Sequence, residues 1–265
     1  MLPLRLSEIW IYPIKSLGGI RLKSSLVQGK GLEHDRRWML VDENNAFMTQ
    51  RIHNQMALFK LQWLGNDFVI TFKGDSISLP IDHSPLGNEI KTKVWDDPVV
   101  TVEMDYSYSS WFSEKLRMPC KLVSFPEINA RPVDSKYAIN NDHVSLADGY
   151  PILIVGQSSL DDLNHKLAIP LPMNRFRPNL VFTGGYPYEE DSWKHFTVGK
   201  NKFAGATPCS RCVLTTVDQE TGEKGKEPLA TLSTYRKTEN KIYFGQNVLA
   251  IDKNEIYEGD EITLV

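Results

Sequence analysis

Residues 57–73 read ALFKLQWLGNDFVITFK, and two runs of alternating apolar and polar side chains, ALFKLQWL and DFVITFK, make up most of this stretch. This alternation is typical of strands with one buried face, because successive side chains of a strand point to opposite faces of its sheet. Gly74-Asp75 follows the second run and predicts a hairpin turn, since both residues tolerate positive φ. The stretch therefore favours a β meander or barrel.

The same alternation continues on both sides of this stretch. We expect further strands at residues 4–11, 20–27, 37–42, 46–51 and 99–104, and later at residues 151–155, 179–184, 212–217, 242–252 and 260–265. Asn44-Asn45 predicts another hairpin turn. The expected fold class is mainly β with a few helices.

Three segments predict helices that cover the sheets. Residues 106–118 carry Trp111, Phe112 and Leu116 at near-helical spacing. A second helix is expected after residue 155, with Ser158 or Ser159 as its N-cap, and a short one within KEPLATLSTYRK, residues 226–237. Residues 125–150 are rich in Pro, Asn and Asp and predict a long ordered loop or a linker.

The composition excludes several classes of protein. The chain has 265 residues, 41% of them hydrophobic and 24% charged, with a formal net charge of −3. It has no polybasic run that would hold nucleic acid or anionic lipid, and no apolar stretch as long as a membrane span, about 18 residues. Only three cysteines are present, which is too few for a disulfide scaffold, so a reducing cytoplasm is the expected location.

The clearest chemical motif is ATPCSRCVLTTV, residues 206–217, in which Cys209 and Cys212 flank Ser210 and Arg211. Structural zinc and an iron–sulfur cluster both need more thiolates or histidines than the chain supplies at suitable spacing. A thioredoxin-type dithiol is expected before a helix, whereas this pair precedes an expected strand. Two incidental thiols remain an alternative. Against that alternative, Arg211 is a fixed cation that favours the thiolate form, which binds soft metals.

Cationic side chains recur in three other motifs. NRFRPNLVFTGG, residues 174–185, places Arg177 and Asn179 at the entrance of an expected strand; they are either solvated, or suited to a phosphorylated heterocycle. IYPIKSLGG puts Lys15 and Ser16 before a glycine pair, where they could bind an anion. LEHDRRWML contains Arg36 followed by a second arginine, and only one of the two should point inward, because strand neighbours face opposite ways.

With these motifs in place, the sequence resembles the MOSC family, and within it the group of mitochondrial amidoxime reducing components. The resemblance covers nearly the whole chain and rests on IYPIKSLGG, GLEHDRRWMLVDENNAFMTQR, NRFRPNLVFTGG, EDSW, PCSRCVLTTVDQETGEKGKEPL and FGQNVLAID. It implies an N-terminal β-barrel-like module at residues 1–120, packed on a MOSC β-barrel at residues 121–265.

The resemblance also implies a molybdenum cofactor (Mo-molybdopterin) held between the two modules. In the family pattern the second cysteine of the pair, here Cys212, is the ligand to molybdenum. The residues implied in cofactor binding are Lys15, Ser16, Arg36, Asp148, Arg177, Asn179, Ser210, Arg211 and Cys212. Asn247 departs from the family, because some relatives have an aromatic residue there.

The function implied is a molybdenum-cofactor-dependent oxidoreductase that reduces N-hydroxylated or N-oxide substrates. Because the chain lacks a cysteine-rich ferredoxin extension, we expect a separate electron-donor protein of the ferredoxin, flavodoxin or cytochrome b5 type. We expect no nucleic-acid partner and no membrane anchor. Two alternatives remain open: a sulfur carrier or sulfurtransferase that uses a cysteine persulfide, and a non-catalytic protein that binds the cofactor.

Overall fold

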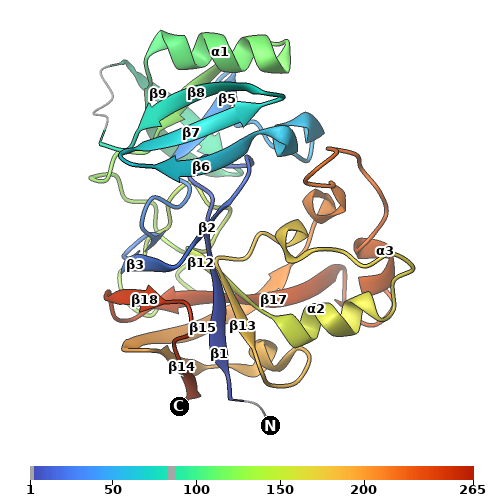
Figure 1. Cartoon of the computed structure of the whole chain (residues 1–265). Helices are drawn as coiled ribbons and strands as arrows, with labels where there is room; N and C mark the ends of the chain where they lie inside the picture. Colours follow the sequence, from blue (N-terminus) through green and yellow to red (C-terminus); the bar gives the residue numbers. More distant parts are fainter. Residues whose placement is uncertain (1–2, 83–86) are drawn as a thin grey trace.

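The computed structural model describes residues 3–82 and 87–265, and these residues form mainly β-strands, with few helices (Figure 1). The α-helices are α1 (Tyr106–Leu116), α2 (Gln157–Asn164) and α3 (Leu229–Leu232), and the 3-10 helices are η1 (Asn54–Leu58), η2 (Met173–Arg175), η3 (Glu189–Ser192) and η4 (Val213–Thr216). The expectation of a mainly β fold is confirmed.

The largest sheet carries strands from both ends of the chain. Its order is β19-β14-β15-β17-β12-β13-β1-β2, and β16 pairs with β17 beside this path. The strands are β1 (Arg5–Ile11), β2 (Ile20–Leu22), β12 (Ile152–Gly156), β13 (Leu180–Thr183), β14 (His195–Val198), β15 (Asn201–Ser210), β16 (Lys237–Thr238), β17 (Lys241–Ala250) and β19 (Ile262–Leu264). The sheet therefore places the first strand of the chain among strands of the second half.

Three smaller sheets complete the β structure. Their orders are β5-β11-β10-β9, β6-β7-β8 and β18-β3-β4. The strands are β3 (Ser24–Gln28), β4 (Gly31–Leu32), β5 (Trp38–Asp42), β6 (Lys60–Leu64), β7 (Asp67–Phe72), β8 (Asp75–Pro80), β9 (Glu89–Val94), β10 (Asp97–Glu103), β11 (Cys120–Ser124) and β18 (Glu255–Tyr257). Figure 1 shows the first two of these sheets, with α1, in the upper part of the molecule and the large sheet below them.

Hydrogen bonds cross the expected boundary at residue 120. β1 pairs with β13 in the large sheet, whereas β11, which begins at Cys120, pairs with β5 and β10 of the upper part. β3, from the first half, pairs with β18 near the end of the chain. A division into residues 1–120 and 121–265 stays a prediction, and the two parts share strands across it.

The helices agree with the sequence except at one cap. α1 begins after Asp105, whose carboxylate accepts a hydrogen bond from the Ser107 N–H (2.9 Å), and it ends where Arg117 adopts φ 56°. The expectation that Ser158 or Ser159 caps α2 is wrong, because the N-cap is Gly156. The Ser159 hydroxyl is buried and instead donates to the Glu190 carboxylate (2.9 Å).

Two expected strands are absent from the described chain. Residues 46–51 form isolated bridges at Ala46 and Phe47 and then a turn, in which the Thr49 carbonyl accepts the N–H groups of Ile52 and His53. The expected strand at residues 212–217 is instead the 3-10 helix η4. In η4 the Thr215 hydroxyl donates to the Cys212 carbonyl, a local bond that competes with strand pairing.

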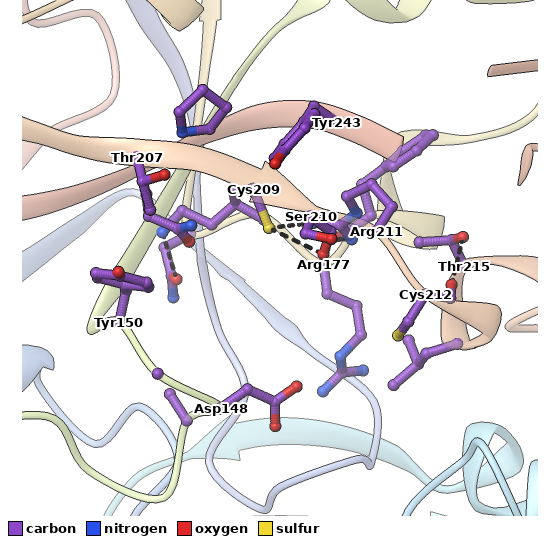
Figure 2. Close-up of a pocket in the computed structure, with 18 of the residues that line it drawn as sticks. Asp148, Tyr150, Arg177, Thr207, Cys209, Ser210, Arg211, Cys212, Thr215 and Tyr243 are labelled. Atoms are coloured by element: carbon purple, nitrogen blue, oxygen red, sulfur yellow. Dashed lines mark hydrogen bonds between the residues drawn. The ribbon is translucent and has the colours of Figure 1, made fainter. Parts of the chain in front are cut away.

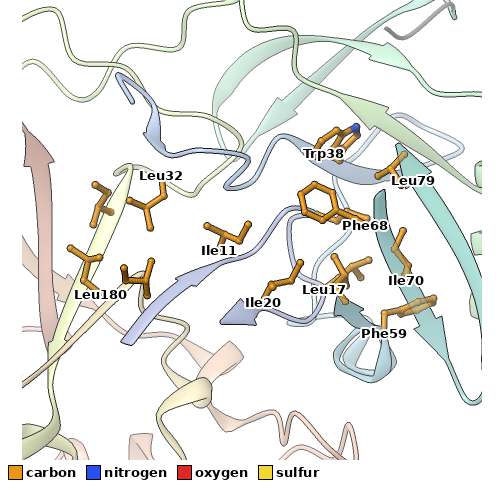
Figure 3. Close-up of a cluster of buried hydrophobic side chains, with 14 of the residues drawn as sticks. Ile11, Leu17, Ile20, Leu32, Trp38, Phe59, Phe68, Ile70, Leu79 and Leu180 are labelled. Carbon is orange, nitrogen blue, oxygen red and sulfur yellow. The ribbon is translucent and has the colours of Figure 1, made fainter. Parts of the chain in front are cut away.

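One apolar core joins the two parts of the molecule (Figure 3). It runs from Leu180 of the large sheet through Ile11 and Leu17 to Phe68 and Leu79 of the β6-β7-β8 sheet, all fully buried. Burying an aliphatic or aromatic side chain of this size contributes about 1.5–3 kcal/mol. The continuous core fixes the two parts relative to each other, and with them the walls of the cavity described next.

Candidate functional site

A cavity of about 550 Å³ lies where residues of both halves of the chain meet (Figure 2). Its walls contain all nine residues that the sequence predicts for cofactor binding: Lys15, Ser16, Arg36, Asp148, Arg177, Asn179, Ser210, Arg211 and Cys212. The structure thus brings the predicted residues to one place. Their role in binding a cofactor stays a prediction.

The cavity is strongly cationic. Seven lysines and arginines line it but only two aspartates do, an excess of five positive charges in a chain whose net charge is −3. The cations are Lys15, Arg36, Arg51, Lys136, Arg177, Arg211 and Lys241, and the carboxylates are Asp134 and Asp148. Clustered cations in a recess focus the field on an anionic ligand. The cavity is therefore suited to bind a multiply charged anion such as a phosphate ester.

The cysteine pair lies at the end of β15, before the turn into η4. The Arg211 N–H donates to the Ile242 carbonyl (2.7 Å), and Cys212 is the N-cap of η4. Because the pair follows a strand and precedes a helical turn, its position no longer argues against a dithiol. Both thiols are free and partly exposed, and both line the cavity.

The Cys212 sulfur is contacted by an arginine of the other half of the chain. Arg51 Nε donates to Cys212 Sγ (3.2 Å), while its Nη2 donates to the Asp148 carboxylate (2.6 Å). Burial lowers the pKa of Arg51, but Asp148 and Cys212 raise it more, so the pKa lies above its usual value. Arg51 is therefore a permanent positive charge beside the sulfur.

Arg211 serves the other cysteine. Its Nη1 donates to Cys209 Sγ (3.0 Å) and its Nη2 donates to the Phe176 carbonyl (2.6 Å). The prediction that Arg211 provides the cation next to a thiol is thus met at Cys209, and Arg51 takes that place at Cys212. Arg211 Nε is buried without a hydrogen-bond partner in the described chain. Such an orphaned donor is suited to an acceptor atom of a bound ligand.

Asp148 links two cations of the cavity, Lys15 and Arg51. Its Oδ1 accepts from Lys15 Nζ (2.5 Å) and its Oδ2 from Arg51 Nη2. Burial raises the pKa of Asp148, but the charges of Lys15 and Arg51 outweigh it and hold the pKa well below its usual range. Burial also lowers the pKa of Lys15 from 10.5 to about 8, against the opposing effect of Asp148.

Arg36 and Arg177 both stack on the buried ring of Tyr12. Their guanidinium carbons lie 4.6 Å and 4.1 Å from the ring centroid. Arg36 is paired with the buried Asp35, and Arg177 Nη1 donates to the Leu17 carbonyl (2.6 Å). In the view of Figure 2 the Arg177 side chain extends into the space between Asp148 and Cys212. Burial lowers the pKa of Arg177 to about 10, so it stays charged near neutral pH.

Three cavity residues have a left-handed backbone. Ser16, Arg36 and Arg177 adopt φ values of 66°, 52° and 52°. A residue other than glycine in this region carries strain of the order of 1 kcal/mol, which persists where the surrounding structure fixes it.

The expectation that only one of Arg36 and Arg37 faces the site is met by Arg36, because Arg37 turns away to Glu127 (2.5 Å) and Gln28 (3.1 Å).

The Asn179 side chain is hydrogen-bonded within the protein and is therefore poorly available to a ligand. Its Oδ1 accepts from Arg36 Nη1 (3.1 Å) and from the Leu153 N–H (3.2 Å), and its Nδ2 donates to the Trp10 carbonyl (3.1 Å). With a side chain 1% exposed, most of its hydrogen-bonding capacity is used inside the protein. Its amide therefore orients Arg36 and links β1 to β12.

Sequence reasoning missed several residues of the wall, above all Arg51. Arg51 ends the motif GLEHDRRWMLVDENNAFMTQR, but the incorrect strand at residues 46–51 gave no reason to place it near the cysteines. Other polar lining residues that it missed include Asp134, Lys136, Tyr137, Tyr150, Thr207, Lys241 and Tyr243. Burial raises the pKa of Tyr150 well above its usual value, so its hydroxyl stays protonated as a hydrogen-bond donor.

Two features are absent from the part of the chain that the structure describes. Between residues 3–82 and 87–265, no group of three or more histidines, cysteines and carboxylates is arranged to hold a metal ion. In the same ranges no helix has the length and apolar character needed to cross a membrane.

The comparisons with known proteins agree with this two-part architecture. Residues 3–119 match the MOSC N-terminal beta barrel domain and residues 141–263 match the MOSC domain. Mitochondrial amidoxime-reducing component 1 of Mus musculus is 30% identical over 98% of this chain and 82% of its own length. The molybdenum cofactor sulfurase of Oryza sativa subsp. japonica is also 30% identical, over 98% of this chain.

This chain spans about a third of that sulfurase, 34% of its length. Among solved structures, the YUAD protein from Bacillus subtilis aligns over 98% of this chain and 94% of its own, with a TM-score of 0.42 and 10% identity, a distant likeness. The family models cover both halves, and the mouse relative aligns over nearly the whole chain. The chain belongs to the MOSC domain family, among the members that also carry a MOSC N-terminal beta barrel domain.

Proposed function

We propose that this protein is a molybdenum-cofactor-dependent oxidoreductase that reduces N-hydroxylated or N-oxide substrates, with the Cys212 thiolate as its ligand to the metal. One observation carries the proposal. A soft sulfur lies in a cavity with an excess of five positive charges, in a protein that is negatively charged as a whole. Thiolates select soft metals, and clustered cations bind phosphate.

The residues present fit such a cofactor. The cavity supplies one soft ligand atom, several guanidinium forks for a phosphate, and the unpaired Arg211 Nε for a further acceptor. Lys15, Ser16, Arg36 and Arg177 would hold the phosphate, while Ser210 and Arg211 would contact the pterin. Asn179 would act indirectly, by holding Arg36. The names of the mouse and rice relatives, an amidoxime-reducing component and a molybdenum cofactor sulfurase, support this assignment.

When bound, the cofactor would supply the two-electron chemistry that removes oxygen from the substrate nitrogen. Two electrons and two protons convert an N-hydroxylated amine into the amine and water. The protein would bind the cofactor, orient Cys212 and shape the substrate pocket. We infer that a separate donor protein of the ferredoxin, flavodoxin or cytochrome b5 type would supply the electrons.

Elemental analysis tests this proposal directly. The protein is expressed in a host that makes the molybdenum cofactor, and molybdenum and phosphorus are measured per chain. We expect both to be near stoichiometric, and we expect the loaded protein to reduce an amidoxime or a hydroxylamine with a strong chemical reductant. A loaded protein inert toward all of these substrates would favour a cofactor-binding protein without catalysis. A protein without molybdenum would refute the proposal.

Sulfur transfer is the second candidate. It is favoured by the rice relative's name and by Cys209, a second free thiol in the same cavity with its own arginine, Arg211. A cation beside a thiol stabilises the anionic sulfur of a persulfide as it stabilises a thiolate. Mass spectrometry of the intact chain would detect a labile additional sulfur atom. That sulfur in a protein without molybdenum would support this function over the first.

A further inference from the structure

We propose that Arg51 is the positioning residue of the cavity: its guanidinium holds the Cys212 sulfur in place and sets the charge around it. The effect on a metal centre rests on the proposed function, whereas the hold on the sulfur does not. The contact joins distant parts of the sequence, because the two partners are 161 positions apart and each comes from a different half of the chain.

Each nitrogen of the Arg51 guanidinium has its own acceptor. Nε donates to Cys212 Sγ (3.2 Å), Nη1 to Thr49 Oγ1 (3.1 Å) and Nη2 to Asp148 Oδ2 (2.6 Å). The guanidinium carbon also lies 4.7 Å from the ring centroid of Trp95. Three hydrogen bonds and a stacked ring fix the plane of the guanidinium, so the Nε–H has one direction, toward the sulfur.

The backbone around Arg51 is held equally firmly. The Arg51 carbonyl accepts from Lys224 Nζ (2.6 Å). The preceding residue, Gln50, is fully buried and donates to the Ser16 carbonyl (2.8 Å), and Gln219 Nε2 donates to the Gln50 side chain (3.0 Å). The turn that carries Arg51 is thus tied to the lysine–serine motif and to the segment after η4. This anchorage lets the turn place a single donor with precision.

A charged donor on a ligand sulfur has two physical effects. It restricts the rotation of the cysteine side chain, and it withdraws electron density from the sulfur. Hydrogen bonds to ligand sulfurs are among the features that set the reduction potential of a metal centre. In the loaded protein, Arg51 should make the metal easier to reduce than it would be beside an unpaired thiolate.

The first test needs no molybdenum. It uses the full chain with Cys209→Ala, purified from a host that lacks the cofactor, in which Cys120 is buried and Cys212 is the accessible thiol. The rates of reaction with the dianionic disulfide dithiobis(nitrobenzoate) and with the neutral dithiodipyridine are compared as a ratio. A cation next to the sulfur favours the anionic reagent, so Arg51→Gln should lower the ratio by about fivefold or more.

The matched control is Lys60→Gln, which removes the same charge from a half-exposed position whose contacts are Gln219 and Glu220. We expect its ratio to stay within about twofold of that of the parent, because a surface charge farther from the sulfur is screened by salt. Arg51→Lys should also keep the ratio, since it keeps the charge. An Arg51→Gln ratio equal to that of the parent would overturn the proposal, whatever the molybdenum content.

The second test separates positioning from charge. In protein that carries molybdenum, Arg51→Gln should lower the reduction potential of the metal, and Arg51→Lys should lower it partly, because lysine lacks the three-way fork. If Arg51→Gln does not fold, the crystal structure of Arg51→Lys tests the proposal instead. We expect the Cys212 side chain to occupy several rotamers in that structure. A single rotamer, the same as in the wild type, would contradict the proposal. If the wild type binds no molybdenum and the reagent ratio still falls in Arg51→Gln, the proposed function fails and the positioning role stands.

Discussion

Arg211 Nη1 lies 3.0 Å from Cys209 Sγ, so the arginine next to Cys212 in the sequence serves the other cysteine of the pair. Cys212 receives its cation from Arg51 instead. Each thiol of the motif thus has its own guanidinium, one from the same strand end and one from the other half of the chain. The two cysteines are chemically distinct, and their variants should behave differently.

Cys212→Ala should remove molybdenum-dependent turnover while the fold stays intact. The side chain is partly exposed and lies at a cavity wall, so its loss should change the free energy of unfolding by about 1 kcal/mol or less. Cys209→Ala is the matched control and should retain metal and turnover. Molybdenum content, N-reductase activity and urea denaturation are measured on both. Retained activity in Cys212→Ala would contradict the assignment of the ligand.

Lys15 should give the protein a stability that rises with pH in the alkaline range. Burial lowers the pKa of folded Lys15 to about 8, whereas the unfolded chain keeps the value of 10.5. Between these values the unfolded state binds more protons, so the free energy of unfolding increases with pH, by up to about 3 kcal/mol. Urea denaturation of the wild type and of Lys15→Met across this range measures the difference.

The free energy of unfolding of the wild type minus that of Lys15→Met should increase as pH rises from about 8 to 10.5. Below pH 8 this difference should be constant. The matched control is Lys91→Met, which removes an exposed lysine from β9. Denaturation curves of Lys15→Met that run parallel to those of the wild type at every pH would show that burial does not depress the Lys15 pKa.

Asn179→Ala should destabilise the protein by about 3 kcal/mol, because it removes the buried hydrogen bonds of the Asn179 amide to the Leu153 N–H, the Trp10 carbonyl and Arg36. Asn247→Ala is the control, as Asn247 lines the same cavity from β17, and it should cost less than about 1 kcal/mol. Chemical denaturation measures both. Equal stability of the two variants would mean that the Asn179 amide does not stabilise the fold and is free to bind a ligand.

Arg131→Gln should loosen the segment that carries Asp148. The buried Arg131 guanidinium donates to the carbonyls of Ser145 (3.0 Å), Ala147 and Asp148 (2.8 Å), and its Nη2 pairs with Asp97 of β10 (2.7 Å). Losing these bonds should cost about 3 kcal/mol or more. Amide hydrogen exchange at residues 143–150 should rise by about tenfold or more, whereas Lys136→Gln, an exposed neighbour, should leave it unchanged.

The β content and most strand positions follow from the sequence, because alternation directly reports which side chains face the core. DFVITFK became β7 with Phe68 and Ile70 buried, and the run at residues 242–252 became β17. One of the two expected strands that did not form, residues 212–217, shows why the alternation can mislead. CVLTTV carries β-branched residues, yet the hydroxyls of Thr215 and Thr216 bond back to carbonyls three residues earlier and close a 3-10 turn. Local side-chain hydrogen bonds of this kind do not appear in a hydropathy pattern.

The site residues that stand in short sequence motifs could be predicted from the sequence. The contacts between residues that are distant in the sequence could not. Lys15, Arg36, Arg177 and the cysteine pair stand in short motifs, and the structure places them around one cavity. The pairing of Arg51 with Cys212 depends on how two halves of the chain pack, and one sequence carries no local signal of that packing. The bridging position of Asp148 between two cations is likewise set by long-range packing.

The insertion of β1 beside β13 sets an order of events during synthesis. Arg5 pairs with Thr183, so the first strand leaves the ribosome long before its partner is made, roughly ten to thirty seconds earlier at typical translation rates. Until then β1 has only β2 along one edge, and its other edge is open. The large sheet therefore stays incomplete while the second half is being synthesised. The cavity between the halves can form only after most of the second half has been translated.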